Sequence, residues 1–278
     1  MKRIGFSSHC FSRSLLIEEI IEFGLIHGFN AMELNVDQAT FNPEIVTDTA
    51  KKLIRGISES GEVRFSMHGP EDVNFSDSTG EGREEAIRRV EAALRLAAEL
   101  KIATVVVHPG KFTVDRGPEG SAEARRQTVA ALKRCAETAR SLDVTVSVEN
   151  LCHVKGIVAP NIKIFLEMCE KVDLATIGVT LDTGHSFVDG LEHTVSVIGE
   201  YVDHIHIDDN SGQRSEHLEL GRGNIDFQAI AEYFRKFEGI INIELKRTHI
   251  DNTKEEDGAP VLRSRDYLLR LLNGVPGR

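Results

Sequence analysis

The sequence predicts an α/β fold, a single (β/α)8 barrel of the TIM type that spans residues 1–278 as one domain. Three observations support this fold class. Short β-rich runs alternate eight times with stretches of helical periodicity. The length of 278 residues is close to the roughly 250 residues that eight such units need. No Pro/Ser-rich linker, low-complexity tract or shift in composition divides the chain. An open, doubly wound sheet is the second choice.

The expected strands are short runs in which apolar and polar side chains tend to alternate. In chain order they are KRIGFSS at 2–8, AMELNV at 31–36, RFSMHG at 64–69, TVVVHPG at 104–110, TVSVEN at 145–150, IGVTLDT at 177–183, VDHIHID at 202–208 and INIELK at 241–246. A helix is expected after each strand, near 14–27, 43–59, 83–99, 121–141, 160–171, 189–199, 226–237 and 260–273. In 83–99 the apolar residues share one helical face, and Arg and Glu cover the opposite face.

Six of the expected strands end in a side chain that can bind a metal ion. These are His68, His108, Glu149, Asp182, His206 and Glu244. In 145–150 and 202–208 the candidate ligands alternate with Val and Ile, so we expect them on the interior side of the barrel. The carboxyl ends of parallel barrel strands meet at one mouth, where the six side chains would converge. Imidazole and carboxylate ligands suit zinc, manganese, cobalt or iron.

Each of these residues alone has an ordinary structural interpretation. A strand histidine is more often a hydrogen-bonded core residue than a ligand, and a buried glutamate could pair with Lys155 or Lys246. Asp182 could simply cap the turn that follows it. The six together are different, because so many buried charges without partners would be strongly unfavourable. The sequence therefore predicts a metal site.

Other residues near the same mouth are weaker candidates. His185 lies three residues after Asp182, and His217 lies in the loop SEHLELGRGNIDF. His9, His153 and Asn150 are also expected near the mouth. His27, His193 and His249 carry no positional argument and are interpreted as ordinary residues. His204 shares the inward face of its strand with His206 and Asp208.

Composition narrows the class of protein. The chain is 41% hydrophobic and 28% charged, as in ordinary globular proteins. No apolar run approaches the ~18 residues of a membrane span, and the amino terminus lacks the apolar core of a signal peptide. The four cysteines, Cys10, Cys135, Cys152 and Cys169, form no CxxC pair. We therefore expect a cytoplasmic protein with reduced cysteines and no membrane contact.

The charge balance argues against a nucleic-acid partner. The chain has 33 basic and 44 acidic residues, a formal net charge of −11, whereas nucleic-acid binders usually present a basic surface. Bound divalent ions would restore positive charge locally, so this argument does not exclude such a partner.

Six motifs together resemble a known superfamily. They are HGPEDVNFSD, VVVHPG, SVENL, GVTLDTGHSF, HIHIDDN and HLELGRGNIDF. In this order they are similar to the xylose-isomerase-like TIM-barrel superfamily, also called AP endonuclease family 2. The resemblance covers nearly the whole chain. It does not decide between two branches with different chemistry.

One branch holds ketose epimerases and sugar isomerases of the D-tagatose 3-epimerase kind. This resemblance implies one metal ion held by four residues, namely Glu149, Asp182, His206 and Glu244. The two glutamates would also act as acid and base on opposite faces of the substrate. His185 and His217 would touch substrate oxygens, although those epimerases place an Arg at the position of His217.

The other branch is endonuclease IV, a trinuclear zinc phosphodiesterase. This resemblance implies a first zinc on His68, His108 and Glu149, and a second that shares Glu149 with Asp182, His206 and Glu244. The third zinc needs His185, His217 and an Asp two residues before that histidine. This chain has Ser215 there. The third site is therefore expected to be weakened or lost, unless Asp208, Asp209 or Glu216 substitutes.

Three features favour the isomerase branch. Glu33 in AMELNV resembles the second strand of that branch, G-F-x-x-x-E-L. NVDQATFNPE replaces the aromatic- and Lys/Arg-rich loop with which the endonuclease penetrates DNA. The absence of Trp and the presence of only three Tyr leave few groups for base stacking. His68 and His108 favour the other branch, because a one-metal isomerase needs them only as contacts to substrate hydroxyls or phosphate.

The sequence predicts a divalent-metal-dependent sugar or sugar-phosphate isomerase or epimerase, which transfers a proton through a metal-stabilised enediolate. The alternative is an endonuclease IV-like zinc phosphodiesterase acting on abasic-site DNA. Glu149 and Glu244 are the expected catalytic residues, and the expected cofactor is one to three ions of Zn, Mn or Co. A substrate phosphate could meet Arg222 or Lys246. The sugar and the oligomeric state stay open.

Overall fold

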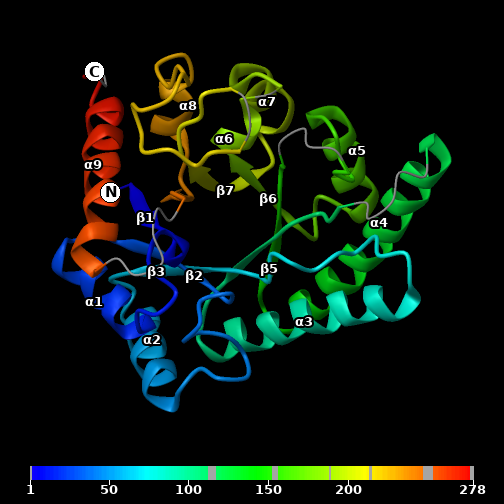
Figure 1. The fold of residues 1–278 in the computed structure, drawn as a ribbon, viewed down its shortest axis with the longest axis horizontal. Coiled ribbons are helices and arrows are strands. Elements are labelled where there is room, and N and C mark those ends of the chain that lie inside the picture. The colour runs from blue at the N-terminus through cyan, green and yellow to red at the C-terminus, as the bar shows by residue number, and fades with distance from the viewer. Residues whose placement is uncertain are drawn as a thin grey trace.

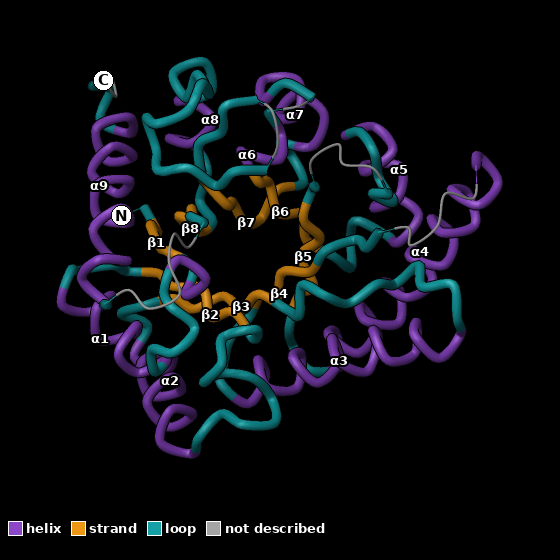
Figure 2. The backbone as a smooth tube through the Cα atoms, in the orientation of Figure 1, coloured by secondary structure: helices purple, strands orange, loops and turns teal. Residues whose placement is uncertain are grey.

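The described residues form one near-closed ring of parallel strands. The computed structural model describes residues 2–111, 117–151, 156–187, 189–212, 215–246 and 253–275. Within these residues eight strands follow the order β1-β8-β7-β6-β5-β4-β3-β2. A parallel bridge between Ser7 and Glu33 links the ends of β1 and β2, which closes the ring. Figure 2 shows the strands around the barrel axis and the helices outside them. The predicted (β/α)8 barrel is therefore confirmed.

The strand and helix bounds follow the predicted alternation. The strands are β1 Arg3–Phe6, β2 Ala31–Asn35, β3 Arg64–His68, β4 Thr104–Val107, β5 Thr145–Glu149, β6 Gly178–Asp182, β7 Val202–Ile207 and β8 Ile240–Ile243. The helices are α1 Ile17–Ile26, α2 Asp48–Ser60, α3 Gly80–Glu99, α4 Gly117–Ser141, α5 Ile162–Val172, α6 Thr183–Ser186, α7 Leu191–Ile198, α8 Ala231–Lys236 and α9 Lys254–Leu272, with a short 3-10 turn η1 at Ser8–Cys10. Helix α9 packs beside α1 at the end of the chain (Figure 1).

Several boundaries differ from the prediction for local reasons. Helix α9 begins at Lys254 rather than near 260, because Thr253 and Glu256 form a capping box ahead of Pro260. Two elements were not predicted, the turn η1 and the single-turn helix α6. Both directly follow strands, and α6 begins where the Asp182 side chain accepts a hydrogen bond from the backbone N–H of His185. Capping by a strand-end carboxylate thus shapes the mouth of the barrel.

The two faces of the strands carry different side chains. The outward face packs apolar residues against the helices, such as Val146 and Val148 of β5. The inward face is polar and also fully buried, with Ser147, Thr180 and Asn242 among its members. A barrel interior is usually filled by branched apolar residues. This interior instead requires hydrogen-bond or ionic partners for its polar groups.

An aromatic cluster packs where the first strands and helix meet. The ring of Phe6 on β1 lies 4.8 Å from Phe29, 5.4 Å from Phe11 and 5.7 Å from Phe23, measured between centroids. Tilted and edge-on contacts at such distances are the favourable arrangements for aromatic pairs. The cluster fixes α1 against β1, at the seam where the ring of strands closes.

The sequence predicts that no segment spans a membrane. Within the described ranges, no helix is both long and apolar enough to cross a membrane.

Because the backbones of β1 and β2 approach closely at Gly5, we expect two Gly→Ala substitutions to differ in their effect on stability. A Cβ at Gly5 would lie 2.9 Å from the backbone of Ala31, whereas one at Gly56 in α2 would meet nothing within 4 Å. Gly5→Ala is therefore expected to lower the free energy of unfolding by about 1–3 kcal/mol, as overpacking does. Gly56→Ala, the matched control, is expected to raise it by roughly 0.5–1 kcal/mol, because Ala is the better helix former. Chemical denaturation of both variants measures the difference; equal stabilities would contradict the close approach of the two strands.

Candidate metal centre

Four side chains from four neighbouring strands converge at the carboxyl end of the barrel. Glu149, Asp182, His206 and Glu244 each offer a ligand atom, and these atoms all lie within 4.8 Å of one another. The parallel register explains this convergence. Asp182 on β6 is the direct partner of His206 on β7. Glu244 lies one residue past β8, and its N–H donates to the carbonyl of Ile207 on β7. Strand pairing thus brings the ligands to one place.

Three atoms of this group are buried without a hydrogen-bond partner among the described residues. They are Glu149 Oε1, Asp182 Oδ2 and His206 Nδ1. His206 Nδ1 lies 3.0 Å from Glu244 Oε2 and 3.6 Å from Glu149 Oε1. Buried polar atoms without partners are rare and unfavourable. A divalent cation that accepts nitrogen and oxygen ligands would satisfy all three atoms, so the residues present fit such an ion.

A second cluster shares Glu149. The Nε2 atoms of His68 and His108 each lie 3.3 Å from Glu149 Oε2. The Nδ1–H of His68 donates to the carbonyl of Gly69 at 2.8 Å, which leaves Nε2 to face the carboxylate. These three residues also form a group with metal-ligand spacing. Glu149 therefore belongs to both clusters: its Oε2 faces His68 and His108, and its Oε1 faces His206.

The charges in this region compensate one another. Burial raises the pKa of the Glu149 carboxyl, but the charge of His206 and the hydrogen bond from His108 outweigh it, and its pKa lies well below the usual range. Burial also raises the pKa of Glu244, but the charge and hydrogen bond of His206 outweigh burial and lower that pKa to about 2. Burial and the nearby charge of Asp208 raise the pKa of Asp182 to about 7, although His185 lowers it.

The imidazoles have the opposite shift. Burial lowers the pKa of His206, but the carboxylates of Glu244 and Glu33 outweigh burial and leave it well above the usual value. Burial likewise opposes the shift at His68, where the hydrogen bond to Glu149 prevails and the pKa is about 10. In the metal-free protein, protons on these groups balance the buried carboxylates. A divalent cation would supply the same positive charge and displace protons.

The two weaker candidates also reach this region. His185 Nδ1 lies 2.9 Å from the carbonyl of Asn150 and 3.2 Å from Glu149 Oε1. His217 Nδ1 lies 3.0 Å from Asp208 Oδ2. The hydroxyl of Ser215 lies between them, 3.1 Å from His185 Nε2 and 2.9 Å from His217 Nε2. The serine thus connects the two imidazoles through one hydroxyl group.

Asp208 belongs to a third group with metal-ligand spacing, together with Asp182 and His217. Its Oδ1 accepts the backbone N–H of Gly184 at 2.8 Å, and its Oδ2 faces His217. Of the three substitutes considered for the missing Asp at position 215, Asp208 is thus the one that lies against His217. Asp208 shares the inward face of β7 with His206, a period-two signal that was already present in the sequence.

Asp209 has a structural role that the sequence did not indicate. Its buried carboxylate accepts four backbone N–H groups: Asn210 at 2.8 Å, Gly221 and Gly223 at 2.9 Å, and Ile225 at 3.1 Å. Asp209 and Leu218 also exchange two backbone hydrogen bonds. The loop that carries His217 is therefore fixed to the end of β7.

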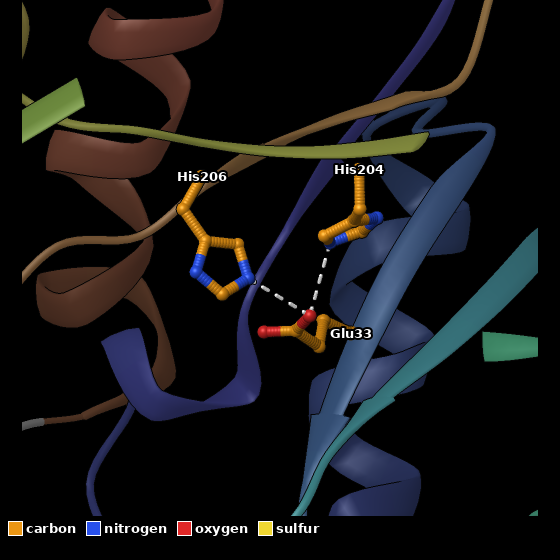
Figure 3. Close-up of side chains that lie close together, drawn as sticks. All are labelled: Glu33, His204 and His206. Carbon is orange, nitrogen blue, oxygen red and sulfur yellow. Dashed lines mark hydrogen bonds and ion pairs between the residues drawn. The ribbon is translucent and has the colours of Figure 1, made fainter. Parts of the chain in front are cut away.

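Two further residues were not predicted as part of the site. Glu33 on β2 lies inside the barrel, where its Oε2 is 3.0 Å from His206 Nε2 and 3.1 Å from His204 Nε2 (Figure 3). Glu33 was noted only for its resemblance to a family motif. His204 was assigned no role, although it lies two residues before His206 on the same face.

A cavity of about 230 Å³ opens above the centre. It is lined by His9, His68, Glu71, His108, Lys111, Glu149, Leu151, Ile157, His185, Ser215, His217 and Glu244. Lys246 lines a different hollow, and Arg222 is exposed beside Glu219. Cys152, His153, Lys155 and His249 lie outside the described residues. The eight predicted site residues therefore come together at the mouth, and their roles stay predictions.

The chain matches one family model and is similar to several known proteins, three of which are described below. A family model described as Xylose isomerase-like TIM barrel matches residues 25–268. "Uncharacterized protein MJ1311" of Methanocaldococcus jannaschii is 27% identical over 259 residues, 88% of this chain and 84% of that protein. "Probable endonuclease 4" of Mycobacterium leprae is 25% identical over 173 residues, 59% of this chain and 66% of that protein. A solved structure of a "D-tagatose 3-epimerase-like protein" superposes with a TM-score of 0.81 at 25% identity, covering 99% of this chain and 98% of that one.

Zinc binding is expected to release more protons at pH 6 than at pH 8. Metal ligands must be deprotonated, and a pKa of about 7 means that Asp182 holds a proton at pH 6 and has largely lost it at pH 8. His206 holds its proton at both values, since its pKa is raised well above the usual one. The apparent zinc affinity should fall accordingly as the pH is lowered. Calorimetric titration in buffers of different ionisation enthalpy measures the protons released; equal numbers at both pH values would contradict the assignment of Asp182.

Proposed function

The chain belongs to the xylose isomerase-like TIM barrel family, and from this premise we propose that it is a divalent-metal-dependent isomerase or epimerase of a sugar or sugar phosphate. The observation that carries the proposal is the pair of carboxylates Glu149 and Glu244 beside one cation position. With Asp182 and His206 they supply ligand atoms within 4.8 Å of one another, and the cavity above them is large enough for a small polar molecule.

The four residues Glu149, Asp182, His206 and Glu244 would hold the ion. When bound there, a divalent cation such as Zn, Mn or Co stabilises negative charge on substrate oxygens and so acidifies the neighbouring C–H bond. The protein's own contribution is to place two carboxylates next to that bond and to surround them with buried polar groups.

Glu149 and Glu244 are the proposed acid and base. Both pKa values lie below the usual range, so both side chains are ionised at neutral pH. One carboxylate can accept the proton of the reacting carbon. That glutamate can then return the proton to the adjacent carbon, or the other glutamate can take a proton from solvent and deliver it to the opposite face of the same carbon. Both line the cavity, so both are accessible to a substrate.

His185 and His217 are the proposed substrate contacts. Both line the cavity, and Ser215 connects their Nε2 atoms. Burial lowers the pKa of each imidazole, but nearby carboxylates outweigh it and raise both values to about 10. Charged imidazoles donate hydrogen bonds, so a substrate carbonyl or hydroxyl that takes the place of Ser215 Oγ would accept them and be oriented.

The alternative function, a zinc phosphodiesterase acting on abasic-site DNA, is supported by the cluster of His68, His108 and Glu149. A two-zinc site of this kind would suit hydrolysis of a phosphodiester. Two observations favour the isomerase instead. Ser215 supplies a neutral hydroxyl where the endonuclease motif has a carboxylate, and the D-tagatose 3-epimerase-like structure superposes over 99% of this chain with a TM-score of 0.81.

The number of bound ions should separate the two functions. Protein purified without chelator is expected to contain about one tightly held divalent ion per chain, because one four-ligand site is complete. Glu244→Gln should lower that number, since it removes one of the four ligands. Elemental analysis of both proteins after gel filtration measures it. Two or three tightly bound zinc ions per chain would instead favour the phosphodiesterase.

Proton transfer itself can be followed with deuterium. We expect the protein to exchange the C3 proton of a ketose, or the C2 proton of an aldose, with solvent deuterium, and Glu244→Gln to reduce exchange by at least about 100-fold. Glu84→Gln is the matched control, because Glu84 pairs with Arg134 at the surface and does not line the cavity. Proton NMR of a panel of sugars measures the exchange. Cleavage of an abasic-site duplex that is lost in Glu149→Gln, with no exchange in any sugar, would overturn the proposal.

A further inference from the structure

One carboxylate inside the barrel collects hydrogen bonds from four side chains. Glu33 is fully buried on the inward face of β2. Its Oε2 lies 3.1 Å from His204 Nε2, 3.0 Å from His206 Nε2 and 3.3 Å from Ser66 Oγ, and its Oε1 lies 3.4 Å from Asn242 Nδ2. The donors come from β3, β7 and β8, so the carboxylate joins strands from opposite sides of the ring.

The contact with His206 determines which ring nitrogen faces the cation position. A carboxylate only accepts hydrogen bonds, so His206 Nε2 must carry the hydrogen that it donates to Glu33. In the neutral ring, the form that binds a metal ion, the other nitrogen, Nδ1, then has the free lone pair. This is the atom that lies 3.0 Å from Glu244 Oε2 and lacks a hydrogen-bond partner within the described part of the chain.

We propose that Glu33 is a positioning residue, which holds the His206 imidazole with Nδ1 directed at the cation and so strengthens metal binding. Figure 3 shows the arrangement: His206 and His204 approach the same carboxylate oxygen from neighbouring positions on β7. The inference rests on the metal-binding part of the proposed function and does not depend on which reaction follows.

A purely structural role for Glu33 would have different consequences. If the carboxylate served only to satisfy His204 and Ser66, its loss would lower stability and leave the metal affinity of the folded protein unchanged. If it acts through His206, the metal affinity itself must fall. Residues that orient a metal-ligating histidine typically change affinity by about 10- to 100-fold.

The test is Glu33→Gln with Ser66→Ala as the matched control. Glutamine keeps the size of the side chain but is neutral, and it offers one acceptor oxygen and an NH2 group that faces the imidazole donors. Ser66→Ala removes a donor to the same oxygen without touching His206. Competition with a chromophoric chelator measures the zinc affinity, and circular dichroism confirms that each variant is folded. We expect a loss of about 10- to 100-fold for Glu33→Gln and less than about twofold for Ser66→Ala, since no ligand is disturbed.

A second variant and a second readout keep the test decisive if Glu33→Gln folds poorly. Glu33→Asp retains the charge but shortens the reach to His206, and it should also weaken zinc binding. In the zinc-loaded wild type, NMR should show a slowly exchanging His206 Nε2–H, which Glu33→Asp makes exchange faster and Ser66→Ala preserves.

The outcomes separate this inference from the proposed function. Equal zinc affinity in wild type and both Glu33 variants, or an equal loss in the Ser66→Ala control, would overturn the positioning role. A wild type that binds zinc with Glu33-dependent affinity, yet exchanges no sugar proton, would refute the isomerase and support the role of Glu33. A wild type that binds no divalent ion would overturn both.

Discussion

The burial of charge inside the barrel is the constraint on which the rest of this structure depends. Glu33, Glu149, Asp182 and Glu244 are all buried, as are His68, His204 and His206. Charged groups in such an environment persist only when partners of opposite charge or a bound cation compensate them. Each carboxylate here lies next to an imidazole. Within the described part of the chain, the atoms of these groups that lack a hydrogen-bond partner are Glu149 Oε1, Asp182 Oδ2 and His206 Nδ1, and they belong to one cluster. The cation position is therefore where the pairing of buried groups is incomplete.

The pairing is organised in layers along the barrel axis. Glu33 and His204 lie deeper, the four candidate ligands lie at the strand ends, and the loop held by Asp209 carries His217 over the mouth. His206 belongs to the first two layers, because Nε2 contacts Glu33 and Nδ1 faces the candidate ligands. The backbone clamp at Asp209 gives the mouth a fixed wall. Rigid strands and a fixed loop are what precise placement of reacting groups requires.

Sequence reasoning predicted the features that local periodicity encodes. The barrel and the convergence of His68 and Asp182 on one mouth follow from strand alternation and from the rule that parallel strands share a carboxyl edge. The family was identified from the resemblance of six motifs instead. The bond between Glu33 and His206 could not be predicted in this way, because the two residues are 173 positions apart in the sequence and meet only across the ring. The clamp at Asp209 was missed for a related reason: its partners are backbone N–H groups, which every residue except Pro offers.

The same constellation can serve one ion or two, and the protonation of His68 bears on the choice. Its Nδ1–H already donates to Gly69, so Nε2 carries a hydrogen only when the ring is charged. The raised pKa of about 10 describes that charged ring. As an imidazolium, His68 donates to Glu149 Oε2 and leaves Oε1 to the position shared with His206. The cluster of His68, His108 and Glu149 then supports Glu149 through hydrogen bonds, whereas a zinc ion there would require His68 to lose its proton. A single ion at the position shared by Glu149, Asp182, His206 and Glu244 requires His206 to lose its extra proton, and a second ion would require His68 to lose one as well.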